Sequence, residues 1–113
     1  MKIEIARIEE HDRGKIFTLS IQHEKRKILY LFHALDRIKK WSLTPEIVAE
    51  TLLLPEEVVK GHRNRYIAHR RYDKHLVRAV YEYEEKMPVL VTVYFPYADR
   101  YFRGGDIYED KVF

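Results

Sequence analysis

The residues best able to do chemistry in this chain are the arginines, histidines and tyrosines after residue 61. The segment 62–78 contains six Lys or Arg residues against one acid, Asp73, and six minus one gives +5, whereas the whole chain carries only +3. Histidines and tyrosines are interleaved with these cations. Basic groups neutralise phosphates and flat rings stack on bases, so the pattern favours contact with RNA or DNA. The alternative is a solvated edge strand that its charge protects from aggregation.

Arg78 is the unusual member of this set, because it stands between Val77 and Ala79 in a predicted central strand. A buried guanidinium requires an anionic partner, which is either a carboxylate (Asp36 or Glu82) or a ligand phosphate. With a phosphate, arginine, lysine, histidine and tyrosine suffice to cleave RNA without a metal. The 2′-OH is the nucleophile, a base removes its proton, a cation stabilises the phosphorane, and an acid protonates the leaving oxygen.

Other chemistries find little support in the sequence. The chain has no cysteine, which excludes disulfides and thiolate catalysis, and its two serines lie in no nucleophile motif. The histidine spacing fits no zinc motif and no glycine-rich phosphate loop occurs, so we expect neither a metal nor a cofactor. No apolar run approaches the roughly 20 residues of a membrane helix, so we expect no membrane and a soluble cytoplasmic protein. The excess of Lys, Arg and Glu is compatible with a thermophilic source.

The elements that must position these residues are read from hydrophobic spacing. Residues 2–8 and 15–21 alternate as two short strands joined by a turn. From about Glu24 the spacing becomes helical, and a second helix begins at Thr44, a good N-cap followed by Pro45, and ends before Pro55. Three strand-like runs follow, at 62–71, 75–83 and 88–95.

This order predicts one α+β domain over residues 1–113. It consists of an N-terminal strand hairpin, two helices and then a twisted antiparallel sheet of three or four strands. We expect the concave face of that sheet to carry a set of basic and aromatic side chains, namely Arg63, Arg65, Arg78, Tyr94 and Arg100.

Several short motifs resemble a known family. They are His33-Ala34-x-x-Arg37 and the segments 42–48, 54–58, 76–81 and 89–94. Together they resemble a family of small prokaryotic domains of unknown function that looks distantly related to the RelE/ParE and BrnT toxins of toxin–antitoxin systems. The resemblance covers about residues 30–103 and implies a RelE/BrnT-like fold. Because ParE-like relatives are not nucleases, the fold does not settle the activity.

The resemblance also implies roles for particular residues. In RelE-like ribonucleases an arginine precedes an apolar pair and a tyrosine in a central strand, which Arg78 matches. A second arginine follows the last long strand, as Arg100 does, and a tyrosine lies near the C-terminus, where Tyr101 or Tyr108 stands. His33 and Arg37 lie one helical turn apart and so share a face. They would act as a base and a phosphate clamp, or they would attach the helix to the sheet or cap a neighbouring loop.

The predicted function is a toxin-like RNA-binding domain and metal-independent endoribonuclease of a toxin–antitoxin system. Its partners would be RNA, including mRNA on the ribosome, an antitoxin protein and a second copy of the chain. The alternative is a non-catalytic protein-interaction or dimerisation module that uses the aromatic C-terminal segment. The predicted catalytic residues are Arg78, Arg100, Tyr101 and His33, and the predicted substrate-binding residues are Arg37, Arg63, Arg65, His69 and Tyr94.

Overall fold

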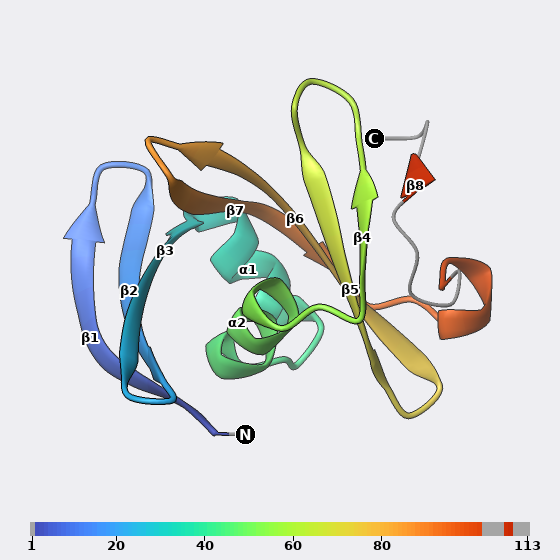
Figure 1. Ribbon diagram of the computed structural model, residues 1–113, viewed down its shortest axis with the longest axis horizontal. Coiled ribbons are helices and arrows are strands. Elements are labelled where there is room, and N and C mark those ends of the chain that lie inside the picture. The colour runs from blue at the N-terminus through green and yellow to red at the C-terminus, as the bar shows by residue number, and fades with distance from the viewer. Residues whose placement is uncertain (1, 103–107, 110–113) are drawn as a thin grey trace.

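The computed structural model describes residues 2–102 and 108–109, which form one mixed β-sheet with two α-helices in its hollow (Figure 1). Across the sheet the strands follow the order β1-β2-β3-β7-β6-β5-β4-β8. The elements in chain order are β1 (Ile3–His11), β2 (Gly14–Ile21), β3 (Glu24–Leu31), α1 (Phe32–Lys40), α2 (Pro45–Leu53), β4 (Glu57–Lys60), β5 (Tyr66–Tyr72), β6 (His75–Glu84), β7 (Met87–Tyr94), the 3₁₀-helix η1 (Ala98–Arg100) and β8 (Tyr108–Glu109).

The predicted fold class was wrong, because the molecule contains far more sheet than two helices over three or four antiparallel strands. The N-terminal strands do not form a separate hairpin. β3 pairs in parallel with β7 through Leu29–Val89 and Tyr30–Leu90, and this pairing joins β1–β3 to the C-terminal strands in one mixed sheet.

Two segments account for the difference. Residues 24–31 were expected to begin a helix, but they form β3, in which Ile28 and Tyr30 alternate onto the core side, and the helix starts only at Phe32. Because Ile28 also fits a helical stripe with Leu35 and Ile38, spacing alone could not separate the two periods. Residues 57–60 were not expected to be a strand, but they form β4, which pairs with β5.

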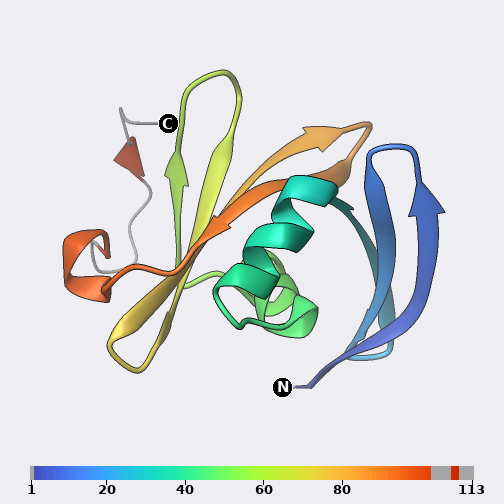
Figure 2. The same ribbon diagram turned by 180° about the vertical axis from the view of Figure 1, so that it is seen from behind.

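The start of α2 confirms a sequence prediction. The Thr44 side chain accepts a hydrogen bond from the Ile47 N–H at 3.2 Å, and Pro45 occupies the first turn. Val48, Ala49 and Leu52 of α2 are buried in the main core against residues from both halves of the sheet. Figures 1 and 2 show both helices between β1–β3 on one side and β5–β4 on the other.

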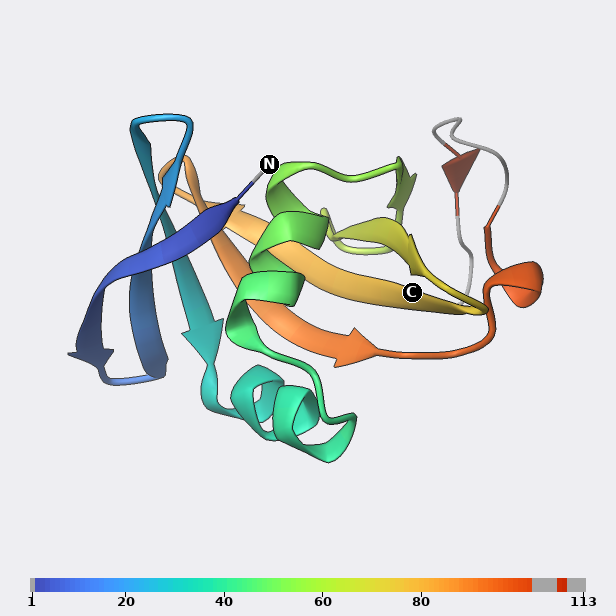
Figure 3. The ribbon, with the colours of Figure 1, turned by 90° about the horizontal axis from the view of Figure 1, so that it is seen from below.

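The opposite face of β4–β7 carries a second, smaller apolar cluster of Val59, Ile67 and Val80. Side chains alternate along a strand, so Ala68 and Ala79 belong to the helix side and Ile67 and Val80 to the outer side. Figure 3 shows β6 and β7 crossing the molecule with the helices to one side of them. Among the described residues, no helix is long and apolar enough to cross a membrane.

Candidate functional site

Four side chains from adjacent strands lie side by side on the outer face of the sheet. Glu57 of β4 pairs in register with His69 of β5, His69 with Arg78 of β6, and Arg78 with Tyr94 of β7. Directly paired residues of antiparallel strands project to the same face. We call Glu57, His69, Arg78 and Tyr94 the polar row. It contains three of the predicted site residues.

Hydrogen bonds within the polar row fix the protonation of His69. Its Nδ1 lies 2.6 Å from Glu57 Oε2, and its Nε2 lies 3.0 Å from Arg78 Nη1. A guanidinium only donates, so Nε2 must accept from Arg78. His69 is therefore a neutral imidazole that carries its proton on Nδ1 and donates a hydrogen bond from Nδ1–H to Glu57. The row links a carboxylate to a guanidinium through one oriented ring.

Burial makes this arrangement energetically demanding. The exposed fractions are 3% for Glu57, 0% for His69 and 1% for Arg78, whereas Tyr94 is half-buried. Charges removed from water are stable only when they are paired and hydrogen-bonded. The opposite charges of Glu57 and Arg78 meet that requirement, and Tyr94 of β7 is the one member of the row that is not buried.

The chain after β7 folds back over the outer face. The Ala98 N–H donates to the Lys74 carbonyl oxygen at 2.9 Å, and Tyr97 forms a β-bridge with His75. Just beyond η1, the ring centroid of Tyr101 lies 4.0 Å from the guanidinium carbon of Arg78. This is cation–π geometry. The structure thus brings a fifth residue, predicted to be catalytic, onto the polar row.

His33 lies near the accessible end of the row. It is exposed at the start of α1, and its Nε2 is 3.1 Å from Thr92 Oγ1. Thr92 and Tyr94 are two residues apart in β7 and so share a face. This contact attaches the helix to the sheet, as one sequence interpretation held, and it also leaves an exposed imidazole beside the row. Arg37 lies one turn further along α1, with its Nη2 3.5 Å from Asp36.

The remaining predicted site residues lie apart from the polar row. Arg63 is in the turn before β5, and Arg100 is an exposed residue of η1. Arg65 Nε lies 3.6 Å from Glu82 Oε2. Of the two carboxylates considered as partners for Arg78, Glu82 thus faces Arg65 and Asp36 faces Arg37. The Tyr108 side chain lies outside the described residues.

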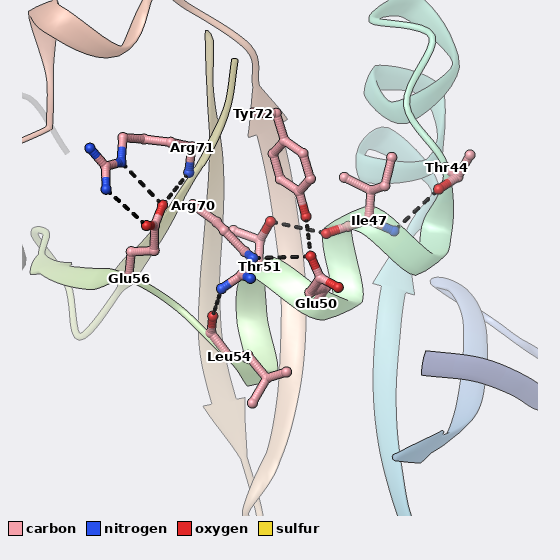
Figure 4. Close-up of polar contacts among 9 residues, drawn as sticks. All are labelled: Thr44, Ile47, Glu50, Thr51, Leu54, Glu56, Arg70, Arg71 and Tyr72. Carbon is pink, nitrogen blue, oxygen red and sulfur yellow. Dashed lines mark hydrogen bonds and ion pairs between the residues drawn. The ribbon is translucent and has the colours of Figure 1, made fainter. Parts of the chain in front are cut away.

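Two further arginines of the basic segment stabilise the fold (Figure 4). Arg70 faces α2, where its Nε donates to Glu50 at 3.0 Å and its Nη1 to the Leu54 carbonyl oxygen at 2.8 Å. The Tyr72 hydroxyl donates to the same Glu50 carboxylate at 2.6 Å, and burial together with that carboxylate raises the pKa of Tyr72 to about 12. Arg71 forms an exposed ion pair with Glu56. Much of the +5 segment is therefore matched by acids elsewhere in the chain.

Sequence reasoning missed Glu57. The segment 54–58 was noted for its resemblance, but no role was given to its two glutamates. The available signal was the alternation of Glu57 with Val59 before Lys60, which indicates a short strand with one face buried. Only the pairing of β4 with β5 shows that this carboxylate meets His69.

Comparisons with known proteins give no further identification. No protein-family model, no curated protein and no solved structure matches this chain. Among the described residues, no group of three or more His, Asp or Glu side chains is placed to hold a metal ion.

Proposed function

We propose that this protein is a toxin-like RNA-binding domain that cleaves RNA without a metal, in the cytoplasm, with the polar row as its centre. One observation supports the proposal above all: Arg78 is held at 3.0 Å by His69, whose Nδ1–H is in turn hydrogen-bonded to Glu57. A donor fixed in advance, in a site with little water, stabilises developing charge far better than a mobile one.

The proposed reaction uses the chain's own residues. The 2′-oxygen of the RNA bonds to the adjacent phosphorus, and the bond from phosphorus to the 5′-oxygen breaks. His33 takes the 2′-proton, and Tyr101 gives a proton to the leaving oxygen. Arg78 stabilises the charge on the phosphorane, and His69 and Glu57 are positioning residues that act through it. The products are a 2′,3′-cyclic phosphate and a 5′-hydroxyl end.

Access to the row is part of the proposal. Because Arg78 is 1% exposed and covered by the Tyr101 ring, RNA must approach from the half-buried Tyr94 and displace that ring. His33, Arg37 and Arg100 lie on elements next to β7 in the chain or in space, and they supply the first contacts with phosphate.

The test is cleavage of end-labelled single-stranded RNA in the presence of a chelator. We expect Arg78→Ala to lower the cleavage rate by about 100- to 1000-fold while Arg70→Ala, a paired arginine on the helix side, changes it little. Arg78→Lys keeps the charge, and its melting temperature shows whether the fold survives. Induced expression should also slow growth and degrade cellular RNA. No cleavage of free or ribosome-bound RNA by the wild type, with growth unchanged, would overturn the proposal.

A second candidate is a non-catalytic interaction module, and the burial of the row favours it. Glu57, His69 and Arg78 would then serve the fold, while the exposed Tyr97, 58% accessible beside η1, would meet a protein partner. Under this alternative Arg78→Ala unfolds the protein, no RNA is cleaved, and sedimentation of the wild type shows a dimer or a complex with a protein partner.

A further inference from the structure

A basic cleft lies on the helix side of the sheet, away from the polar row. It has a volume of about 430 Å³ and is formed between β3, the β6–β7 turn and the C-terminal end of α2. Volumes of about 300–1,000 Å³ are usual for small-ligand sites. The pairing of β3 with β7 is confined, in the described chain, to Leu29 and Tyr30, so the first half of β3 stands apart from the turn.

Four cations line this cleft: Lys25, Arg26 and Lys27 from β3 and Lys86 from the turn. Glu85 is the one acid of the lining, and four minus one gives +3. Arg26 and Lys27 have exposed ion pairs with Glu24 and Glu9, at 3.1 and 4.0 Å. Such exposed pairs contribute little to stability. Lys25 and Lys86 have no ion pair within the part of the chain that the structure describes.

Tyr83 gives the cleft an aromatic wall. The residue is 55% exposed, yet its ring is held in T-shaped contact with Tyr81 at 5.7 Å and with Tyr66 at 5.9 Å. A ring that is fixed by two neighbours and remains open to solvent can accept a flat partner at low entropic cost. Leu53 supplies apolar lining beside it.

We propose that this cleft binds single-stranded RNA, with a base stacked on Tyr83 and the flanking phosphates on Arg26 and Lys86. Arg26 lies on the same face of β3 as the core residue Ile28, whereas Lys25 and Lys27 alternate to the opposite face. Single strands are bound in this way, by cations that follow the backbone and by rings that accept any base. The inference rests on the proposed function only in taking RNA as the ligand. The cleft and Arg78 lie on opposite faces of the sheet, so the cleft is a binding site separate from the cleavage centre.

The experiment is fluorescence anisotropy of a labelled oligoadenylate RNA with the full chain at several salt concentrations. Replacing Arg26 and Lys86 together with alanine should lower the slope of log affinity against log salt by about 1.4, since each single-strand phosphate contact contributes about 0.7. Tyr83→Leu keeps an apolar side chain without the ring and should weaken binding by about 5- to 100-fold.

Matched controls keep the test sharp. Replacing Lys2 and Lys39 with alanine removes the same charge elsewhere on the surface and should leave affinity nearly unchanged, and melting temperatures should show that each variant folds. Any of three results would overturn the cleft as an RNA-binding site. They are equal weakening of binding by the control variant, no effect of Tyr83→Leu on affinity, and equal affinity for duplex RNA. Failure of this inference is distinguishable from failure of the proposed function. Variants of the cleft should weaken RNA binding, whereas the cleavage that depends on Arg78 should remain.

Discussion

At the residue scale, two neighbouring glutamates have very different surroundings. Glu57 is 3% exposed and bonded to His69, whereas Glu56 forms an exposed pair with Arg71. We expect Glu57→Ala to lower the free energy of unfolding by about 3–5 kcal/mol, because it leaves buried partners uncompensated. Glu56→Ala should cost at most about 1 kcal/mol. Urea unfolding of both variants measures the contrast, and equal losses would contradict the polar row.

The same Glu56 gives a pH prediction. Its hydrogen bonds from Arg71 hold the pKa of the carboxyl below its ordinary value of 4.5. A lowered pKa in the folded state means stability that is complete above the ordinary pKa and is lost as pH falls through the folded value. Glu56→Gln should therefore flatten the loss of stability below about pH 4.5 and change little at neutral pH. Thermal melts between neutral and acid pH check this.

The Tyr101 side chain has two proposed roles, a ring contact with Arg78 and proton donation by its hydroxyl, and a mutation can separate them. Tyr101→Phe keeps a ring over Arg78 and removes the hydroxyl. If the hydroxyl is the general acid, cleavage should slow by about 100- to 10,000-fold while RNA affinity stays the same. Single-turnover rates measure the effect. An unchanged rate would exclude Tyr101 as the acid and leave only its ring contact with Arg78.

At the element scale, the N-cap of α2 stabilises the helix through residues of its first turn alone. Thr44→Ala removes the acceptor for the Ile47 N–H, so the free energy of unfolding should fall by about 1 kcal/mol. Thr44→Ser keeps the oxygen and is the matched control. Urea titration of the two variants gives the difference, and an equal effect of both would mean that packing of the threonine methyl group, and not the cap, is responsible.

At the scale of the whole molecule, the N-terminal strands share one core with α2 and the C-terminal strands. Phe17, Ile21 and Tyr30 are buried in the same cluster as Val48 and Val77. Arg13, from the β1–β2 turn, also forms two hydrogen bonds of 2.8 and 2.6 Å with Glu84 at the end of β6.

Removal of residues 1–31 should therefore abolish cooperative folding, although the whole polar row lies in the remainder. The truncated chain would expose the core side of α2, and it should lack near-UV circular dichroism and bind a hydrophobic dye. The full chain should unfold in one transition seen by every probe. A cooperative transition of the truncated chain at the full-length melting temperature would contradict a shared core.

Local features were predictable from the sequence where all the residues that determine them lie in one short segment. The Thr44-Pro45 start of α2 depends on neighbours within a single turn, and it was confirmed. The unusual position of Arg78 was also evident from the sequence. Burying an arginine between Val77 and Ala79 costs free energy unless its charge is paired. The boundary at Phe32 was not predictable, since Ile28 fits both the strand alternation with Tyr30 and a helical stripe with Leu35 and Ile38.

Only the tertiary structure decided the rest, because it depends on which strands pair. The parallel pairing of β3 with β7 turns two separate sheets into one, and no local pattern specifies a contact across sixty residues of chain (Leu29 to Val89). In the same way, register sets Glu57 against His69 and His69 against Arg78, and it assigns Arg70 to the helix side. The sequence by itself determined which residues could do chemistry, whereas strand pairing determined which of them meet, because the free energy of burying a charge depends on neighbours that lie far away along the chain.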